Sequence, residues 1–493
     1  MEGTVTCNVA SSFKGTTADI GSAKNYMAIP DETGYTFQRY NVQVTHMSIN
    51  PGKESVGYKA TVYGSDAVLA NIETVGYTLQ LGNYTPVSAE KAFDPAKTVV
   101  TLRVDNYGIA TYGETDLSAS ACIVLKDGTV AQSKAVTYTF RQMLEAMDAV
   151  LDSLTNPQIS AIQAMYNKYA AEIQSWNLPN ISTWVDPRIP TPEQMEGIDP
   201  ENIYYVGPTR EYTSVTKLFM DLEDDDSEKI IFLDEGTYDI FQEYRDLGIT
   251  TPPDDVESPD YFPYCVFLPA NTRLIGLGDV RLEFSPKADE ITYGESRTWS
   301  PLNIIAPCYI ENIEVYCKNG RYAIHDDSHN AANDQGSQHI YKNVRAIYEL
   351  SDIDSQGRRL GFNNTIGNGI AQGAEHLFED CLFEFRGANS YSAFYTHESG
   401  SKNPENSPTL TFRRCSFLGG EGNTRTIRLQ NLATTDLHIP TTIEDCYIEG
   451  GIYLTIYKDT SAQHFDVTVI RSGNPPVMID KPDENKYPVK IEE

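Results

Sequence analysis

A five-residue phrase recurs five times in the C-terminal half of the chain. Its copies are Tyr309–Ile313, Ile340–Val344, Leu377–Cys381, Thr411–Cys415 and Thr442–Cys446. The last residues of successive copies lie 31, 37, 34 and 31 positions apart. A period in this range is typical of a solenoid, whose repeats bury their apolar faces only by stacking on one another. Turn residues and strand-like runs fill the repeats, with little helical periodicity, so we expect a β-solenoid.

The repeat also predicts a ladder of side chains. If each copy forms the same part of a coil, its last residue points inward and stacks on the equivalent residue of the next coil. The expected ladder contains Ile313, Val344, Cys381, Cys415 and Cys446. An Asn or Asp precedes the ladder residue in four of the five copies and can satisfy backbone groups at a turn. We interpret the cysteines as reduced, buried, small hydrophobic residues.

Composition narrows the classes of partner. The net charge is −31 and the pI about 4.6, which disfavours nucleic acid and anionic membranes as partners. No apolar run approaches the length of a membrane-spanning helix, so we expect no membrane insertion. The first residues lack the basic and apolar regions of a signal peptide, so we expect synthesis in the cytoplasm of the producing cell without a signal peptide. The sequence contains no CxxC pair, which is a common signature of a structural zinc site, so no metal site is assigned.

The first 138 residues alternate apolar and polar positions in short runs separated by turn residues. Examples of these runs are Gln38–Met47, Gly57–Tyr63 and Ser120–Leu125. Strands at this spacing predict a β-sandwich over residues 1–138.

Residues 139–177 change to a helical period. Apolar residues repeat at alternating intervals of three and four in two segments, one beginning at Phe140 and the other at Ile159. This seam favours short coiled-coil helices in an oligomer, with a helical hairpin packed on a neighbouring domain as the alternative. The mixed residues of the seam do not distinguish two strands from three.

Residues 178–200 contain five prolines, which predicts a stiff, extended linker. The solenoid is expected over 201–473, beginning with a capping helix at Thr213–Leu222. Residues 474–493 are interpreted as a loosely packed C-terminal tail.

Three elements together resemble the pectate-lyase-like superfamily of right-handed parallel β-helices. These elements are the capping helix followed by Ile230–Asp239, the phrase Asn271–Gly278, and the repeated strands. The fold class that this implies is mostly β, with an N-terminal sandwich, short helices and a C-terminal right-handed parallel β-helix. The resemblance covers about 202–470 and says little about chemistry.

The order of a β domain, a helical seam, a proline linker and a β-helix resembles bacteriophage tail spikes and receptor-binding proteins. Residues 1–176 also resemble the baseplate attachment module of phages of Gram-positive hosts. These resemblances imply a homotrimer in the virion tail. They also imply attachment to tail or baseplate proteins at the N-terminus, and binding of bacterial cell-surface polysaccharide by the β-helix.

Polar residues that follow three predicted strands are the candidate site. The catalytic candidates are His325, Asp326, Asp327, His397 and Glu398. Coils about 4.8 Å apart place carboxylates one or two coils apart at glycosidase spacing. An acidic, His-containing groove can also cleave uronic glycosides by elimination, a reaction that usually uses Ca²⁺. Otherwise no cofactor is expected.

The carbohydrate-binding candidates are His329, Tyr391, Tyr395 and Arg428, because exposed tyrosine rings stack on sugar faces. Three functions stay open. The chain is a polysaccharide-binding spike, a polysaccharide depolymerase (a hydrolase or a lyase), or a purely structural baseplate component. Alternatively, the same polar residues simply hydrogen-bond turns and line a solvated interface.

Overall fold

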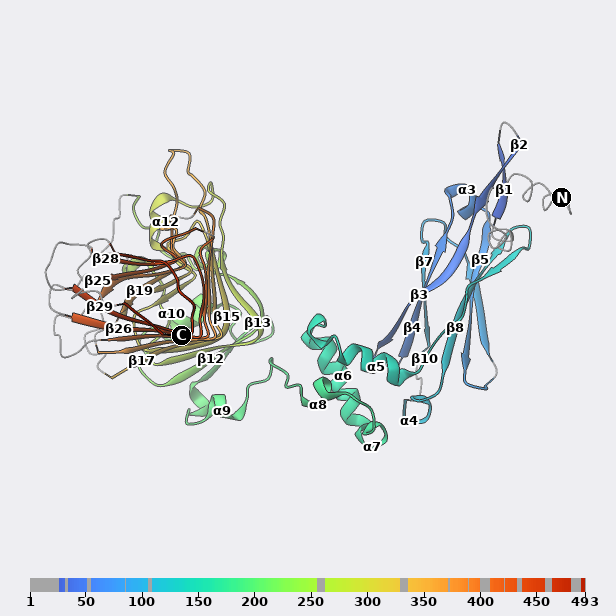
Figure 1. Ribbon diagram of the computed structural model, residues 1–493, viewed down its shortest axis with the longest axis horizontal. Helices are drawn as coiled ribbons and strands as arrows, with labels where there is room; N and C mark the ends of the chain where they lie inside the picture. Colours follow the sequence, from blue (N-terminus) through green and yellow to red (C-terminus); the bar gives the residue numbers. More distant parts are fainter. Residues whose placement is uncertain are drawn as a thin grey trace. The chain divides into compact units, whose positions relative to one another are not determined.

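The computed structural model divides the chain into two compact units, residues 1–186 and 187–493 (Figure 1). The residues that it describes are 26–31, 34–50, 55–84, 86–104, 109–254, 262–328, 336–370, 373–388, 390–399, 408–420, 422–431, 437–456, 463–479 and 489–492. The division falls inside the proline-rich segment, which contains the short helices α8 (Pro179–Thr183) and α9 (Pro192–Met195).

The first unit contains antiparallel sheets around one core. One sheet has five strands: β10 (Val136–Tyr138), β8 (Leu117–Leu125), β5 (Ile72–Leu81) and β6 (Val87–Ala92) in that order, with β9 (Val130–Gln132) paired to β8. A second has three strands: β3 (Asn41–Asn50), β4 (Ser55–Tyr63) and β7 (Val99–Val104). A hairpin, β1 (Tyr26–Asp31) and β2 (Gly34–Arg39), and the short helices α3 (Asp66–Leu69) and α4 (Ile109–Tyr112) complete these layers. Buried residues of both larger sheets share a single cluster, which is compatible with the expected sandwich.

The helical seam packs into that same core. Its elements are α5 (Phe140–Asp148), a 3₁₀ turn (Leu151–Ser153), α6 (Asn156–Lys168) and α7 (Ala170–Ile173). A buried carboxylate ties α5 to α8, because Asp148 Oδ1 accepts from the backbone N–H of Ile181 at 2.7 Å. The apolar seam is therefore covered by its own chain. The expected coiled coil is not confirmed. In the single chain the helices pack against the neighbouring β domain, which was the alternative expectation.

The second unit is dominated by two parallel sheets. The larger has 14 strands, and its first members are β11 (Ile203–Val206), β12 (Lys229–Asp239), β13 (Thr272–Phe284) and β15 (Cys308–Lys318). After β15 it continues as two rows. One row contains β17 (Gln338–Lys342), β20 (Glu375–Glu379), β23 (Thr409–Arg413), β26 (Leu437–Glu444), β29 (Gln463–Ile470) and β31 (Val489–Glu492). The other contains β18 (Arg345–Glu349), β21 (Leu382–Arg386), β24 (Ser416–Leu418) and β27 (Tyr447–Glu449).

The smaller parallel sheet has seven strands. They are β14 (Leu302–Ile304), β16 (Ile324–Asp326), β19 (Ile366–Ile370), β22 (Phe394–Ser399), β25 (Ile427–Asn431), β28 (Ile452–Ile456) and β30 (Val477–Ile479). The chain passes in turn through both rows of the large sheet and then through the small one, and the next passage pairs in parallel with the last. Figure 1 shows these strands stacked from green to red. The arrangement is compatible with a solenoid.

The expected ladder is confirmed by the strand register. Residues directly after Ile313, Val344, Cys381, Cys415 and Cys446 pair with one another from coil to coil, and all five ladder residues are buried. The residue before each ladder position lies at the corner between the two rows and has a left-handed backbone. These corner residues are Asn312, Asn343, Asp380, Arg414 and Asp445, with φ between 51° and 57°.

Helices close the first coils. The expected capping helix is α10 (Val215–Asp221), whose N-cap Ser214 accepts from the N–H of Lys217. Further helices are α11 (Ile240–Asp246) and α12 (Tyr293–Thr298). At the other end, β30 and β31 lie in the segment expected to be a loose tail, and they pair with β28 and β29. Among the described residues, no helix combines the length and the apolar character needed to span a membrane.

Candidate functional site

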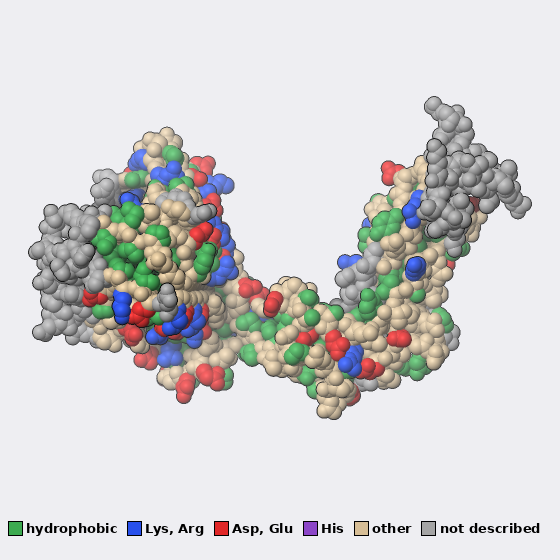
Figure 2. Space-filling model, viewed as in Figure 1, with side chains coloured by type: hydrophobic (Ala, Val, Ile, Leu, Met, Phe, Trp, Pro, Cys, Tyr) green, Lys and Arg blue, Asp and Glu red, His purple; other side chains and the backbone are tan. Residues whose placement is uncertain are grey.

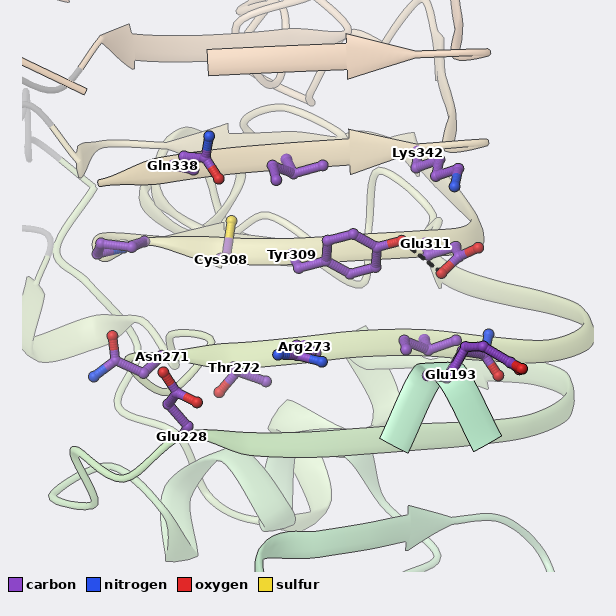
Figure 3. A pocket seen from close by; sticks show the side chains of 14 residues that line it. Glu193, Glu228, Asn271, Thr272, Arg273, Cys308, Tyr309, Glu311, Gln338 and Lys342 are labelled. Carbon is purple, nitrogen blue, oxygen red and sulfur yellow. Dashed lines mark hydrogen bonds between the residues drawn. The ribbon is translucent and has the colours of Figure 1, made fainter. Parts of the chain in front are cut away.

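A cleft opens on the outer face of the large parallel sheet, at its N-terminal end (Figure 3). Its volume is about 570 Å³. It crosses β13, β15 and β17 beside α9, and Glu228, directly before β12, lies at its edge. Its lining residues include Glu193, Glu228, Asn271, Arg273, Tyr309, Glu311, Gln338, Ile340 and Lys342.

The cleft lies at the edge of a chain segment that covers the first strands. Ile198, with Met195 and Ile203 packed nearby, forms an apolar cluster with outward residues of β12 and β13, among them Ile230 and Ile275. Among the described residues this cluster reaches as far as the partly buried Tyr309 of β15, and the outward residues of the cleft lie beside it. Strand pairing aligns Arg273, Tyr309 and Ile340 in one column across three coils. The sheet therefore presents a cation, an aromatic ring and an aliphatic side chain in a row.

Tyr309 is fixed at the middle of this row. Its hydroxyl donates to Glu311 Oε2 at 2.8 Å, as Figure 3 shows. Partial burial, and then the hydrogen bond and charge of Glu311, raise the pKa of the Tyr309 hydroxyl. The phenol therefore stays protonated at physiological pH, and its half-buried ring is held in one orientation. A fixed aromatic ring beside polar groups is suited to stacking on a sugar.

Two cations of the cleft form no close ion pair with the described residues. Neither Arg273 nor Lys342 forms an ion pair within 4.0 Å with any of them. Farther along the same sheet cations are paired, as in Arg414 with Asp380 at 2.7 Å and Arg471 with Asp445 at 2.7 Å. Figure 2 shows such mixed positive and negative side chains on the visible face of the second unit. The cleft thus offers two cationic groups to a ligand, alongside the carboxylates of Glu193 and Glu228.

The residues nominated from sequence lie mainly on the small sheet, away from this cleft. Register aligns His325, Gly367, Tyr395 and Arg428 in one column. Tyr395, one of the binding candidates, lies beside Arg428 in this column. The His325 side chain is fully buried, with the ring of Tyr322 5.3 Å away and Asp327 Oδ1 4.0 Å from Nε2.

The binding candidates on this face contact one another or the core. The Arg428 guanidinium lies 4.7 Å from the Tyr395 ring centre and donates to Gln430 at 2.9 Å. The half-buried Tyr391 packs against Phe385, with ring centres 5.4 Å apart. His329 and the side chains of His397 and Glu398 lie outside the described residues, so their positions as candidates stay predictions.

Asp326 points to the opposite side of its strand, into the interior. Its Oδ2 lies 3.8 Å from Nδ1 of both His339 and His376. Tyr341 donates to Oδ2 at 2.7 Å, and Ser328 donates to Oδ1 at 2.6 Å. The ligand atoms of the three residues lie within 4.8 Å of one another and are fully buried, an arrangement that can hold a metal ion.

The groups of this interior cluster shift the pKa values of Asp326 and His376. Burial raises the pKa of Asp326, but the two imidazole rings and the hydroxyls of Ser328 and Tyr341 outweigh it and hold that pKa below its usual value. Burial and the neighbouring His339 lower the pKa of His376 to about 3, although Asp326 opposes the shift. His376 is therefore neutral at physiological pH.

Sequence reasoning missed both the cleft and the two interior histidines. His339 and His376 occupy the same position of the repeat, two residues before Tyr341 and Phe378. An alignment of the repeats one position further back would have predicted that they stack. No sequence pattern indicates the cleft, because its edge is formed where the segment around α9 crosses the sheet.

Comparison with known proteins adds no constraint: no protein-family model matches this sequence, and no curated protein matches it.

Proposed function

We propose that this chain is a receptor-binding protein of the bacteriophage tail-spike type, with a right-handed parallel β-helix as its second unit. In this proposal the β-helix binds bacterial surface polysaccharide. The first unit attaches to tail or baseplate proteins, and the functional form is a homotrimer in the virion. The observation that carries the proposal is the outer cleft, where the fixed Tyr309 ring stands between cations that lack an ion-pair partner among the described residues.

The chemistry of the cleft suits a glycan. An open cleft along stacked strands accommodates an extended chain, and a tyrosine ring stacks on the apolar face of a sugar. Arg273 and Lys342 can donate to hydroxyl, carboxylate or phosphate oxygens, which are the groups that bacterial surface polysaccharides carry.

The test is incubation of the purified full chain with polysaccharide from the host surface, followed by size separation of sugar and protein. Intact sugar that co-elutes with the protein supports a binding spike. Fragmented sugar makes the chain a depolymerase, in keeping with the carboxylates Glu193, Glu228 and Glu311 in the cleft. Intact sugar without co-elution contradicts both and favours a structural baseplate component.

Three variants locate the binding. Tyr309→Ala removes the stacking ring and should weaken retention of the sugar about fivefold to a hundredfold, if the ring contributes roughly the 1–3 kcal/mol that aromatic side chains contribute by stacking on nucleobases. Tyr447→Ala is the matched control, because Tyr447 is an exposed tyrosine on β27 of the same sheet, outside the cleft. Arg428→Ala tests the face nominated from sequence. Full binding by Tyr309→Ala together with loss in Arg428→Ala would move the site to that face.

A further inference from the structure

The interior cluster links the two parallel sheets across the second unit. Asp326 ends β16 of the seven-stranded sheet, whereas His339 and His376 lie on β17 and β20 of the large sheet. The two imidazoles come from adjacent coils and stack with ring centres 4.4 Å apart and planes 4° from parallel. One carboxylate oxygen therefore faces two imidazole nitrogens at the same distance.

The separations are close to those of a coordinated ion. Bonds of about 2.0–2.2 Å in tetrahedral geometry place neighbouring ligand atoms roughly 3.4 Å apart. Each Nδ1 lies 3.8 Å from Asp326 Oδ2, so these two ligand pairs need to close by only a few tenths of an ångström, and the ligand atoms of all three residues lie within 4.8 Å of one another. Because the two ring planes are nearly parallel, both rings must also turn about their side-chain bonds so that the Nδ1 lone pairs converge on a common centre.

Asn368 supplies an independent sign of a ligand. It is fully buried on β19, one coil beyond Asp326 and in register with it. Its Nδ2 lies 3.2 Å from Asp326 Oδ2 and 3.5 Å from His376 Nδ1, while its Oδ1 has no hydrogen-bond partner among the described residues. A half-turn of the Asn368 amide exchanges Nδ2 and Oδ1 and directs the unpaired oxygen at the cluster, where it becomes a fourth ligand.

We propose that Asp326, His339, His376 and Asn368 bind one divalent first-row transition-metal ion of the zinc class. Two imidazoles with one carboxylate select such an ion over Ca²⁺ and Mg²⁺, which prefer oxygen ligands alone. Tyr341 and Ser328 orient the carboxylate from outside the ligand set, as hydrogen-bond partners of metal ligands do. Because all four ligands are fully buried, the ion has no open position for a substrate. It is a structural ion that joins three coils and both sheets.

The experiment is metal analysis of the full chain, freed of any histidine tag and refolded with Zn²⁺ or Co²⁺. We expect about one ion per chain, visible absorption bands from the Co²⁺ form, and a rise of several degrees in Tm over the EDTA-treated chain. Ca²⁺ should produce neither the bound ion nor the rise. Substoichiometric Zn²⁺ with an unchanged Tm would overturn the proposal and leave the cluster as a hydrogen-bonded part of the core.

Variants separate metal binding from folding. His376→Gln should lose the ion and the metal-dependent rise in Tm. His325→Gln is the control, since it removes another fully buried imidazole next to Asp326 but on the opposite side of β16. Retention of the ion by His376→Gln contradicts the proposal. If that variant fails to fold, the Co²⁺ spectrum and the EDTA dependence of the unsubstituted chain still decide.

Discussion

The corner residues are the smallest feature that shapes the second unit. Each lies between the two rows of the large sheet in a left-handed conformation, yet its N–H still bonds to the next coil, as from Asn343 to Glu379 O at 2.9 Å. Their side chains also connect coils, since Asn343 Nδ2 donates to Asn312 Oδ1 at 2.7 Å. Asn and Asp favour this conformation because their short polar side chains satisfy the local backbone. The left-handed backbone at the corner therefore favours Asn and Asp at this position of the repeat.

Substitution at a corner tests this directly. Asn343→Val should lower the free energy of unfolding by at least about 1–2 kcal/mol, because a β-branched residue is strained at positive φ. Asn343→Gly should cost less, since glycine adopts the conformation freely. Denaturant titration of both variants measures the difference. Equal destabilisation by Val and Gly would contradict the backbone explanation and assign the effect to the lost contact with Asn312.

Glu295 is a second residue whose environment has a measurable consequence. It is fully buried at the start of α12, where Arg245 donates to its two oxygens at 2.7 and 2.9 Å and Thr251 donates at 2.8 Å. Burial raises its pKa, but Arg245, the backbone N–H of Thr292 and Thr251 together hold that pKa below the ordinary value of 4.5. The carboxylate is thus more acidic in the folded chain than in the unfolded chain.

The sign of the pH dependence follows. The stabilisation by ionised Glu295 is complete above its unfolded pKa and is lost as the pH falls from about 4.5 through the lower folded pKa. Glu295→Gln should therefore be less stable than the unsubstituted chain at neutral pH, and the two should converge in acid. Thermal unfolding between neutral and acidic pH checks this. A difference that stays constant down to the lowest pH would exclude the ionised carboxylate as its source.

At the scale of elements, like side chains stack between neighbouring strands. Tyr341, Phe378 and Phe412 follow one another on β17, β20 and β23, with ring centres 4.6 and 5.1 Å apart. Edge contacts from Phe383 and Phe394 fill the rest of the interior around them. A parallel register with a constant coil height allows this stacking, because every coil brings the same position to the same place.

Removal of the central ring should be costly. Phe378→Ala leaves a cavity between two stacked rings and should lower the free energy of unfolding by about 3–5 kcal/mol. The matched control is Leu377→Ala, one residue earlier, where the half-buried side chain lies on the outer face. Chemical denaturation of the two variants compares them. If Leu377→Ala lowers the free energy of unfolding as much as Phe378→Ala does, the ring stack contributes no more to stability than an outward side chain.

At the scale of the whole molecule, the two units have separate cores. The buried seam residues of α5 and α6 belong to the core of the first unit, and the interior of the second unit forms another. A trimer therefore needs contacts other than this seam, since the same side chains cannot serve both packings. The oligomeric state of the chain and the stability of the first unit can therefore be changed and measured separately.

One substitution distinguishes the two packings of the seam. Ile162 is fully buried on α6, so Ile162→Asp should destabilise the first unit by several kcal/mol and leave the mass of any oligomer unchanged before that unit unfolds. Light scattering and circular dichroism on the same samples measure both. A fall in mass to the 54.9 kDa of one chain, with the first unit still folded, would restore the coiled coil.

The sequence alone determined the period of the second unit, its buried ladder and the nature of its corner residues, because stacked coils repeat their local requirements at each turn. It also located the capping helix. Only the tertiary structure decided that Asp326 faces inward toward His339 and His376, since this depends on how strands of different sheets meet. The outer cleft was equally beyond sequence reasoning, because the segment around α9 forms its edge by crossing strands distant in sequence.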